Sequence, residues 1–412
     1  MKILWITQIY PWTSTLANLL ATRAEILLLC PQASPVKTNI CNCNIHYINI
    51  TEEELTCTKM TSSIAEKYLS VIDQYKPDII HIHGSERNYG QLQNYLPDIP
   101  IVIGIQGILK GCLPFVTNYL EDDDLRPYKT LKNLFGRGGV HMQKKLLQKR
   151  CKRYELDILQ HGQYFFCRTN WDKAWIHFNN PKANIYQGEE LLREPFYVHS
   201  GKWNVQEAKR HNIFMPSGFN PLKGLHIALK ALVQLKTFYP DIMLTVPGLP
   251  QHILSYGKIK SRIIGEEYIN YCVSIIEDHQ LKKNISLLPR LDAEGMVKEM
   301  INANVFLSPS SIDNSPNAVG EAMMIGVPIV STPVGGVLSI LRDEESCLFA
   351  PAGDEFLMAY QIKRIFEDDE LATKLSTNAR KVASQRHNKQ QTLNQYICAY
   401  QTIINTHKQK SQ

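Results

Sequence analysis

Short runs of apolar residues alternate with helix-length segments along most of the chain. In the first half these runs are KILWIT, AEILLLCP, NIHYINI, DIIHIHG, IPIVIGIQG and QYFFCRT, and in the second half they are NIFMPS, DIMLTVPG, NISLLPR, NVFLSPS and VPIVSTP. Apolar runs that end in Gly, Pro or Ser and are separated by helices are typical of parallel strands with crossover connections. The pattern predicts α/β architecture with doubly wound parallel sheets, in which ligands bind at the carboxyl ends of the strands.

The length of the chain indicates two domains. A chain of 412 residues is longer than one ordinary core requires, and it suits two domains of about 150–200 residues each. We predict a first Rossmann-like domain over residues 1–195 and a second over residues 205–387, joined within a polar segment at 188–209. Residues 388–412 are predicted to form a C-terminal helix that packs back on the first domain.

Composition and charge exclude several classes of protein. No apolar run reaches the ~18 residues of a membrane span, and Lys2–Thr7 is interpreted as a buried strand rather than a signal peptide. The ten cysteines form no CxxC pair, which predicts reduced thiols and no zinc site. We therefore expect a cytoplasmic protein without a metal. Its net charge of +6 suits an anionic ligand, and no nucleic-acid-binding signature accompanies it, so no nucleic acid partner is expected.

A basic cluster lies late in the first predicted domain. Six lysines and arginines lie between Lys144 and Arg153, on a helix predicted from Val140 to Leu159. Such a face is ordinarily solvated, but clustered basic residues also bind anionic headgroups or a lipid-linked diphosphate. Both interpretations stay open, and the second predicts peripheral contact with the inner face of a membrane.

One predicted helix in the second half follows directly on a strand. The apolar strand at residues 304–308 leads into a polar loop, after which Ser315 suits an N-cap and Pro316 the first helical position. Gly326 stands where such a helix would end. The start of a helix presents unpaired N–H groups and a positive dipole, so this loop predicts a diphosphate site.

Two carboxylates flank the start of this helix. Asp313 lies in the loop at the end of the strand, and Glu321 follows Asn317 by one helical turn and shares its face. A carboxylate at such a place accepts hydrogen bonds from two hydroxyls, which is how sugar or ribose hydroxyls are held.

This strand–loop–helix resembles the acid-x7-acid signature of retaining nucleotide-sugar glycosyltransferases of family 4. The resemblance implies the GT-B fold, in which two Rossmann-like domains face a cleft. In that family two glutamates stand eight residues apart, the first on the transferred sugar and the second on the nucleotide ribose. Those roles fall on Asp313 and Glu321, and Asp313 is one methylene shorter than the family's acid. Ser315 and Asn317 are assigned to donor binding at the same helix start.

Further parts of the second half resemble the same family. Gly335 and Gly336 follow another strand, as the family's glycine loop does, and small residues let backbone amides approach a phosphate. Lys223 precedes a glycine in the segment NPLKGLH, where the family's lysine neutralises the leaving diphosphate. Many members carry an arginine where this chain has Gly218, and Arg290 is the candidate replacement. Four residues near strand ends complete the predicted donor site: Gly218, Pro247, Gly248 and Arg290.

The first half carries the candidate acceptor side. His81 and His83 end a strand two residues apart, and no third ligand with metal-binding spacing accompanies them. The family often has a similar His-x-His near its cleft, so core and cleft roles are both retained for this pair. His83, Gly84 and Glu86 are assigned to the cleft.

Two other positions in the first half depart from the family pattern. Gln106 stands where many members have a histidine near the sugar, and it can donate and accept hydrogen bonds without titrating. The segment after the first strand has no glycine, and its Trp12 is interpreted either as a packed aromatic or as a ring that stacks on a sugar.

The resemblance implies a metal-independent transferase without a cofactor. It would move a hexose from a UDP- or GDP-sugar to a glycan or lipid-linked acceptor with retention of configuration, in the synthesis of cell-surface polysaccharide or glycoconjugate. An alternative is a GT-B protein that binds nucleotide sugars with little or no turnover. It rests on four departures from the pattern: Gly218, Asp313, Gln106 and the missing glycine loop after the first strand. A sugar-nucleotide epimerase is a third hypothesis.

Overall fold

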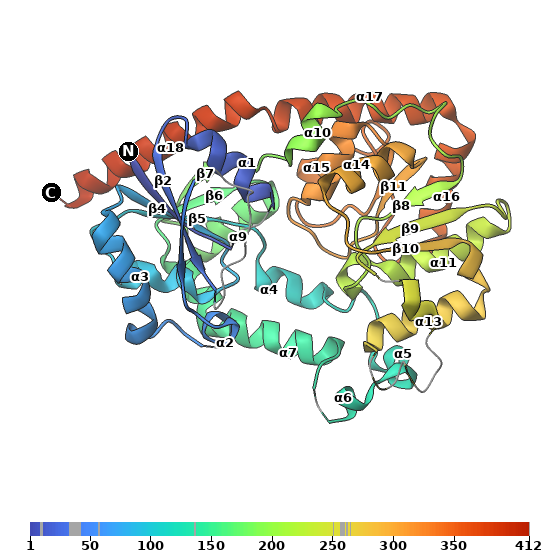
Figure 1. The fold of residues 1–412 in the computed structure, drawn as a ribbon, viewed down its shortest axis with the longest axis horizontal. Helices are drawn as coiled ribbons and strands as arrows, with labels where there is room; N and C mark the ends of the chain where they lie inside the picture. Colours follow the sequence, from blue (N-terminus) through green and yellow to red (C-terminus); the bar gives the residue numbers. More distant parts are fainter. Residues whose placement is uncertain are drawn as a thin grey trace. The chain divides into compact units, whose positions relative to one another are not determined.

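A computed structural model of the chain describes residues 1–8, 11–32, 43–56, 58–135, 137–249, 251–255, 260, 263 and 265–411. It separates into two compact units (Figure 1). The first unit comprises Met1–Leu113, Leu146–Arg193 and Arg386–Gln412, and the second comprises Pro114–Lys145 and Glu194–Gln385. No helix in the described part of the chain is long and apolar enough to cross a membrane.

The first unit is built on a parallel sheet. Its described strands have the order β3-β2-β1-β4-β5-β6-β7, so the winding reverses between β1 and β4. The end of β4 therefore lies at the topological switch point, where such folds bind ligands. The strands are β1 (Lys2–Ile6), β2 (Glu25–Pro31), β3 (Asn44–Ile48), β4 (Ile79–His83), β5 (Ile101–Gly104), β6 (Tyr164–Cys167) and β7 (Asn184–Gln187).

Helices cover both faces of this sheet, because the strands bury apolar side chains on both sides. One core joins the strands to buried residues of α3 and α8, and the other joins them to α1 and α18. In the second core, Trp5 Nε1 donates to the hydroxyl of Tyr400 on α18 at 3.1 Å. The helices are α1 (Pro11–Leu20), α2 (Glu52–Thr56), α3 (Ser62–Tyr75), η1 (Asn88–Asn94), α4 (Leu109–Cys112), the π-helical η4 (Cys151–Glu155), α8 (Leu156–His161), α9 (Asn170–Asn179) and α18 (Lys389–Ser411).

The second unit contains the second parallel sheet. Its described strands have the order β10-β9-β8-β11-β12-β13, so β8 and β11 flank the switch point. The strands are β8 (Asn212–Phe214), β9 (Met243–Pro247), β10 (Ile285–Leu288), β11 (Val305–Ser308), β12 (Ile329–Ser331) and β13 (Leu348–Phe349). The helices are α5 (Asp122–Leu125), η3 (Arg126–Tyr128), α6 (Leu131–Leu134), α10 (Glu194–Val198), η5 (Pro221–Lys223), α11 (Leu225–Lys236), η6 (Gln251–Ser255), α13 (Glu267–Asp278), η7 (Leu281–Lys283), α14 (Ala293–Asn302), α15 (Asn317–Ile325), η8 (Val337–Ser339) and α16 (Glu355–Glu367).

Three helices lie at the divisions between the units. The 3-10 helix η2 (Leu113–Phe115) and the helix α7 (Val140–Arg150) contain the ends of the segment 114–145, and α17 (Asp369–Arg386) contains the last division.

The segment 114–145 belongs to the second unit, whereas the sequence analysis assigned it to a first domain spanning 1–195. The reason is a set of contacts with residues far along the chain. The Tyr128 carbonyl accepts from Asn270 Nδ2 at 3.3 Å, and its ring lies 5.4 Å from that of Tyr271. The Val140 amide donates to Glu267 at 3.2 Å. Local patterns along the sequence carry no signal for these partners.

Candidate functional site

The residues predicted to bind a donor follow the carboxyl ends of strands in the second unit. The loops after β8, β11 and β12 meet there through backbone hydrogen bonds. The Ser311 amide donates to the Leu222 carbonyl at 2.9 Å, and the Thr332 amide donates to the Ser308 carbonyl at 3.2 Å. The fold thus gathers three loops that lie far apart in the sequence, at the edge where parallel sheets bind ligands.

Lys223 and Asp313 form an ion pair within this group of loops. Lys223 Nζ lies 2.6 Å from Asp313 Oδ2, and their side chains are 36% and 18% exposed. Lys223 is the last residue of η5, and the amide of Leu222 is capped by the Asn220 side chain at 3.0 Å. A partly exposed cation and carboxylate are therefore held together at the switch point, where both can reach a ligand.

The glycine loop after β12 fixes the backbone of Asp313. The Gly336 amide donates to the Asp313 carbonyl at 2.9 Å. Gly335 has a φ of +53°, and a Cβ atom there would collide with the same carbonyl oxygen. Only glycine tolerates both the left-handed backbone and this close approach, so the loop can pack against Asp313 without a side chain between them.

The helix α15 begins one residue later than the sequence analysis predicted. Pro316 is the N-cap instead of Ser315, because its extended backbone (φ −67°, ψ 114°) leaves only its carbonyl in the helix. That carbonyl accepts from the Val319 amide at 3.0 Å. The helix ends at Gly326 in the left-handed conformation, as predicted.

Glu321 lies one turn into α15, on the face of Asn317. Its residue is only 3% exposed, while Asn317 and Ser315 at the start of the helix are partly exposed. The structure thus places a buried carboxylate behind the partly exposed start of the helix. This position suits hydroxyls of a ligand that enters at the helix start.

Gly218 is packed so tightly that a side chain at this position would need its neighbours to move. A Cβ atom there would come within 3.0 Å of both Leu225 and Val246. Many family members carry an arginine at this position, and the tight packing here suits a glycine instead. Gly248 has a φ of +87° and open space around it, directly after Pro247 at the end of β9. Arg290 is exposed after β10, two strands away from β8.

In the first unit, the predicted cleft residues lie at the ends of the neighbouring strands β4 and β5. The Gly84 amide donates to the Gly104 carbonyl at 2.8 Å, and Gly84 has a φ of +92°. Added Cβ atoms at Gly84 and Gly107 would both approach the Glu86 carboxylate, which therefore lies between these two backbones. Burial raises the pKa of Glu86, although an amide hydrogen bond from Gly107 opposes the shift.

Gln106 follows β5 and is held through its backbone. Arg168 Nη2 donates to the Gln106 carbonyl at 2.9 Å, while Arg168 Nη1 pairs with Glu190 at 3.1 Å. The side chain of Gln106 is partly exposed beside Gly84. A buried ion pair thus fixes the backbone that presents the amide side chain.

The paired histidines have different surroundings. His81 is buried in the core, and its Nδ1 lies 2.7 Å from the Tyr400 hydroxyl. The His83 ring lies 4.2 Å from that of His81 and 4.4 Å from that of Trp5. Burial lowers the pKa of His83 to about 4, so it is neutral at pH 7. No group of three potential metal ligands occurs among the described residues.

The structure adds little to two predictions, the stacking role of Trp12 and the binding role of the basic cluster. Trp12 lies on α1, and its side chain is outside the described residues. The basic cluster Lys144–Arg153 lies on α7 and η4, with Lys145, Lys149, Lys152 and Arg153 exposed.

Glu155 was missed by the sequence analysis. It lies on the π-helical segment η4 and is buried, and its carboxylate accepts from the amides of Leu109 and Lys110 at 2.5 and 2.8 Å. Burial raises its pKa to about 7, against these amide hydrogen bonds and with a further contribution from Glu86. A buried acid therefore caps the start of α4, which begins three residues after Gln106. A glutamate in a basic helix gives no sequence signal of such burial.

Glu155→Gln is expected to remove a pH dependence of stability. The folded state raises the pKa of Glu155 from 4.5 to about 7, so its stabilising contribution is complete below pH 4.5 and is lost as the pH rises through 7. Glutamine does not ionise. Between pH 4.5 and 7.5 the parent should therefore lose about 1–3 kcal/mol of unfolding free energy relative to the variant.

Urea unfolding at both pH values measures this difference. Glu66→Gln, at an exposed position of α3, is the matched control and should change stability equally at both. A parent–variant difference for Glu155→Gln that is the same at both pH values would contradict the assignment.

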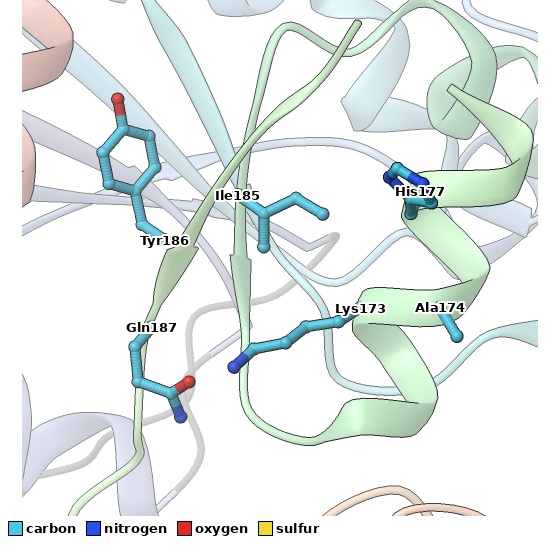
Figure 2. A pocket seen from close by; sticks show the side chains of 6 residues that line it. All are labelled: Lys173, Ala174, His177, Ile185, Tyr186 and Gln187. Carbon is cyan, nitrogen blue, oxygen red and sulfur yellow. The ribbon is translucent and has the colours of Figure 1, made fainter. Parts of the chain in front are cut away.

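A separate hollow of about 460 Å³ lies on the first unit between α9 and the edge strand β7. Figure 2 shows the Lys173 side chain extending from α9 toward Gln187 of β7. None of the predicted site residues lines this hollow, so it is not part of the candidate site.

Comparisons with known proteins agree with this fold. Over 98% of this chain and all of the other, the structure is similar to sucrose-phosphate synthase from Thermosynechococcus elongatus, with a TM-score of 0.71 and 15% identity. It is also similar to Anabaena HepE in complex with UDP and glucose, with a TM-score of 0.65 and 14% identity over 98% of this chain and all of that one. The predicted GT-B fold, with two Rossmann-like parallel-sheet domains, is confirmed.

Most of the second unit is similar in sequence to a known family. Residues 202–382 match the family model of glycosyl transferases group 1. The chain is 29% identical over 189 residues to the putative colanic acid biosynthesis glycosyltransferase WcaL of Salmonella typhimurium, covering 44% of this chain and 42% of that protein. The chain thus spans less than half of the length of the curated relatives it matches. The ion pair of Lys223 and Asp313 and the buried Glu321 all lie within the matched domain.

Proposed function

We propose that this protein is a retaining glycosyltransferase that moves a hexose from a UDP- or GDP-sugar to a glycan or lipid-linked acceptor. The observation that carries the proposal is the Lys223–Asp313 ion pair, held at 2.6 Å by three converging loops inside a glycosyl transferases group 1 domain. The complex of the structural neighbour HepE with UDP and glucose supports a nucleotide-sugar donor, and UDP-sugar in particular.

In this proposal the second unit binds the donor. The Lys223 ammonium and the amides at Gly335 and Gly336 neutralise the diphosphate, and the start of α15 adds its positive dipole. Glu321 accepts hydrogen bonds from the ribose hydroxyls, and Asp313 accepts them from the hexose. Lys223 pairs with Asp313 in the structure, so a bound diphosphate would compete with Asp313 for the ammonium.

The chemical step breaks the bond between the anomeric carbon and the diphosphate oxygen. The acceptor hydroxyl oxygen bonds to the same carbon from the same face, and its proton passes to the departing phosphate oxygen. Negative charge grows on the diphosphate as the bond breaks, where the Lys223 ammonium and the glycine-loop amides are preorganised to stabilise it. We propose that these groups replace a metal ion, and that no other cofactor takes part.

We assign the acceptor side to the first unit. His83, Gly84, Glu86 and Gln106 lie at the ends of β4 and β5, next to the switch point of that sheet. The basic cluster Lys144–Arg153 supports contact with an anionic membrane surface or a lipid-linked diphosphate. The similarity to a putative colanic acid biosynthesis enzyme supports a role in cell-surface polysaccharide or glycoconjugate synthesis.

Release of nucleoside diphosphate tests the proposal. The protein is incubated with a panel of UDP- and GDP-sugars, with and without candidate acceptors and with a chelator present, and free UDP or GDP is measured. One base should be preferred, and release should continue in chelator. Release that stops in chelator would contradict metal independence, and the absence of release with every donor would contradict transfer.

The second candidate function is binding of a nucleotide sugar without turnover. The tight packing around Gly218, where many family members carry an arginine, is the observation that favours it. Binding of a donor without release of nucleoside diphosphate would support this function. Conversion of the donor into another nucleotide sugar, detected by NMR, would instead indicate an epimerase.

A further inference from the structure

The segment 114–145 approaches the loop of Lys223 through one buried side chain. Asn118 is 0% exposed, and its Nδ2 donates to the Pro221 carbonyl at 2.9 Å. Close by, Ser311 Oγ donates to the Phe115 carbonyl at 2.7 Å. The segment therefore contacts the two loops that carry Lys223 and Asp313.

The backbone of Asn118 is held from the other side by His226. His226 Nε2 lies 3.1 Å from the Asn118 carbonyl oxygen, and Nδ1 lies 3.1 Å from the Tyr268 hydroxyl. Burial lowers the pKa of His226 to about 4, so the ring is neutral at pH 7. Because a carbonyl only accepts, Nε2 carries the proton and donates to Asn118, and Nδ1 accepts from Tyr268.

The chain is strained at this contact. Asn118 and Tyr119 have φ values of +49° and +63°, so two consecutive non-glycine residues are left-handed. Asparagine tolerates this region, but tyrosine rarely adopts it, and such strain persists only where surrounding contacts impose it. The Tyr119 ring packs on Gly353, where a Cβ atom would come within 3.0 Å of it.

The turn that follows Lys223 is packed closely between its neighbours. Gly224 has a φ of +80°, and a Cβ atom there would collide with the Pro309 carbonyl oxygen and lie 3.1 Å from Asn118 Nδ2. The Lys223 amide donates to the Asn220 carbonyl at 2.9 Å. Asn118 and Pro309 therefore enclose the turn from which the Lys223 side chain extends to Asp313.

We propose that Asn118 is a positioning residue for Lys223, so that a strained turn in the first part of the chain sets the place of the diphosphate-binding cation. The inference rests on the proposed function, in which Lys223 binds the donor diphosphate. Asn118 itself contacts the Pro221 carbonyl and acts only through the Lys223 turn.

The test compares affinities for UDP and UMP, or for GDP and GMP, by calorimetry on the full chain. Asn118→Asp keeps the shape of the side chain but removes the Nδ2 donor to the Pro221 carbonyl. Asn118→Gly also removes this donor, and glycine readily adopts the left-handed backbone. Both should weaken nucleoside diphosphate binding about 10- to 100-fold, the usual effect of losing a hydrogen bond to a charged group. Monophosphate binding should change little, and neither variant should add to the effect of Lys223→Met.

Asn270→Asp is the matched control, because Asn270 holds the same segment at Tyr128 but not at the Lys223 turn. It should leave the ratio of diphosphate to monophosphate affinity unchanged. Unchanged diphosphate affinity in Asn118→Gly, or equal losses for both nucleotides, would overturn the positioning role alone. If the unmodified protein binds no nucleotide, the proposed function falls as well.

Discussion

Replacing Lys223 with methionine is expected to lower turnover of the nucleotide sugar about 10²–10³-fold, the usual effect of removing one preorganised contact to developing charge. The reason is that the leaving diphosphate gains negative charge as the anomeric bond breaks, and Lys223 is the cation that the fold holds at the switch point of the second sheet. Its 2.6 Å pair with Asp313 indicates that the ammonium already lies beside the proposed sugar-binding acid. Steady-state release of nucleoside diphosphate measures the effect.

Two variants distinguish this effect from the general loss of a lysine ion pair. Lys282→Met removes a lysine that pairs with Glu277 at 3.1 Å on the same unit, and it should leave turnover unchanged. Lys223→Arg keeps the charge and should recover part of the rate. Turnover of Lys223→Met within a few-fold of the parent would contradict the role of Lys223 in the chemical step.

Replacing Glu321 with alanine is expected to weaken nucleotide binding by about 100-fold or more, because hydrogen bonds to a charged group contribute ~1.5–3 kcal/mol each. Glu321 is 3% exposed on α15, so we expect its carboxylate to bind ribose hydroxyls with little competition from water. Calorimetry with the nucleoside diphosphate that the parent prefers measures the loss.

A ligand change distinguishes this role from a structural one. The 2′,3′-dideoxy form of the same nucleotide lacks the hydroxyls that Glu321 is proposed to bind. The parent should bind it about as weakly as Glu321→Ala binds the normal nucleotide, and Glu321→Ala should bind both forms equally. If the variant still discriminates against the dideoxy form, another residue holds the ribose.

The parts of the fold and site that depend on local pattern were predictable from the sequence. Apolar runs ending in small residues predicted the strands, and parallel strands bring their carboxyl ends to one edge. The loops of Lys223, Asp313 and Gly335 therefore had to lie near one another. The end of α15 at Gly326 was also predicted, because only a glycine readily takes the left-handed conformation found there.

Features that depend on distant partners were not predictable in this way. Asn118 is about a hundred residues from Pro221 and His226, and neither its burial nor its strained backbone has a local signal. From the sequence, Glu155 is expected on a solvated basic helix, but in the structure its carboxylate is buried against the start of α4. The predicted cap at Ser315 failed by one residue, since Pro316 adopts an extended backbone that excludes it from the helix.

The central claim is that the second unit binds a nucleotide sugar through Lys223, the glycine loop and Glu321. A crystal structure of the protein grown with UDP or GDP, whichever binds, tests it most directly. We predict the diphosphate within hydrogen-bond distance of Lys223 Nζ and of the Gly335 and Gly336 amides, with the ribose hydroxyls on Glu321. A nucleotide bound on another surface, with these groups in the arrangement described above, would contradict it.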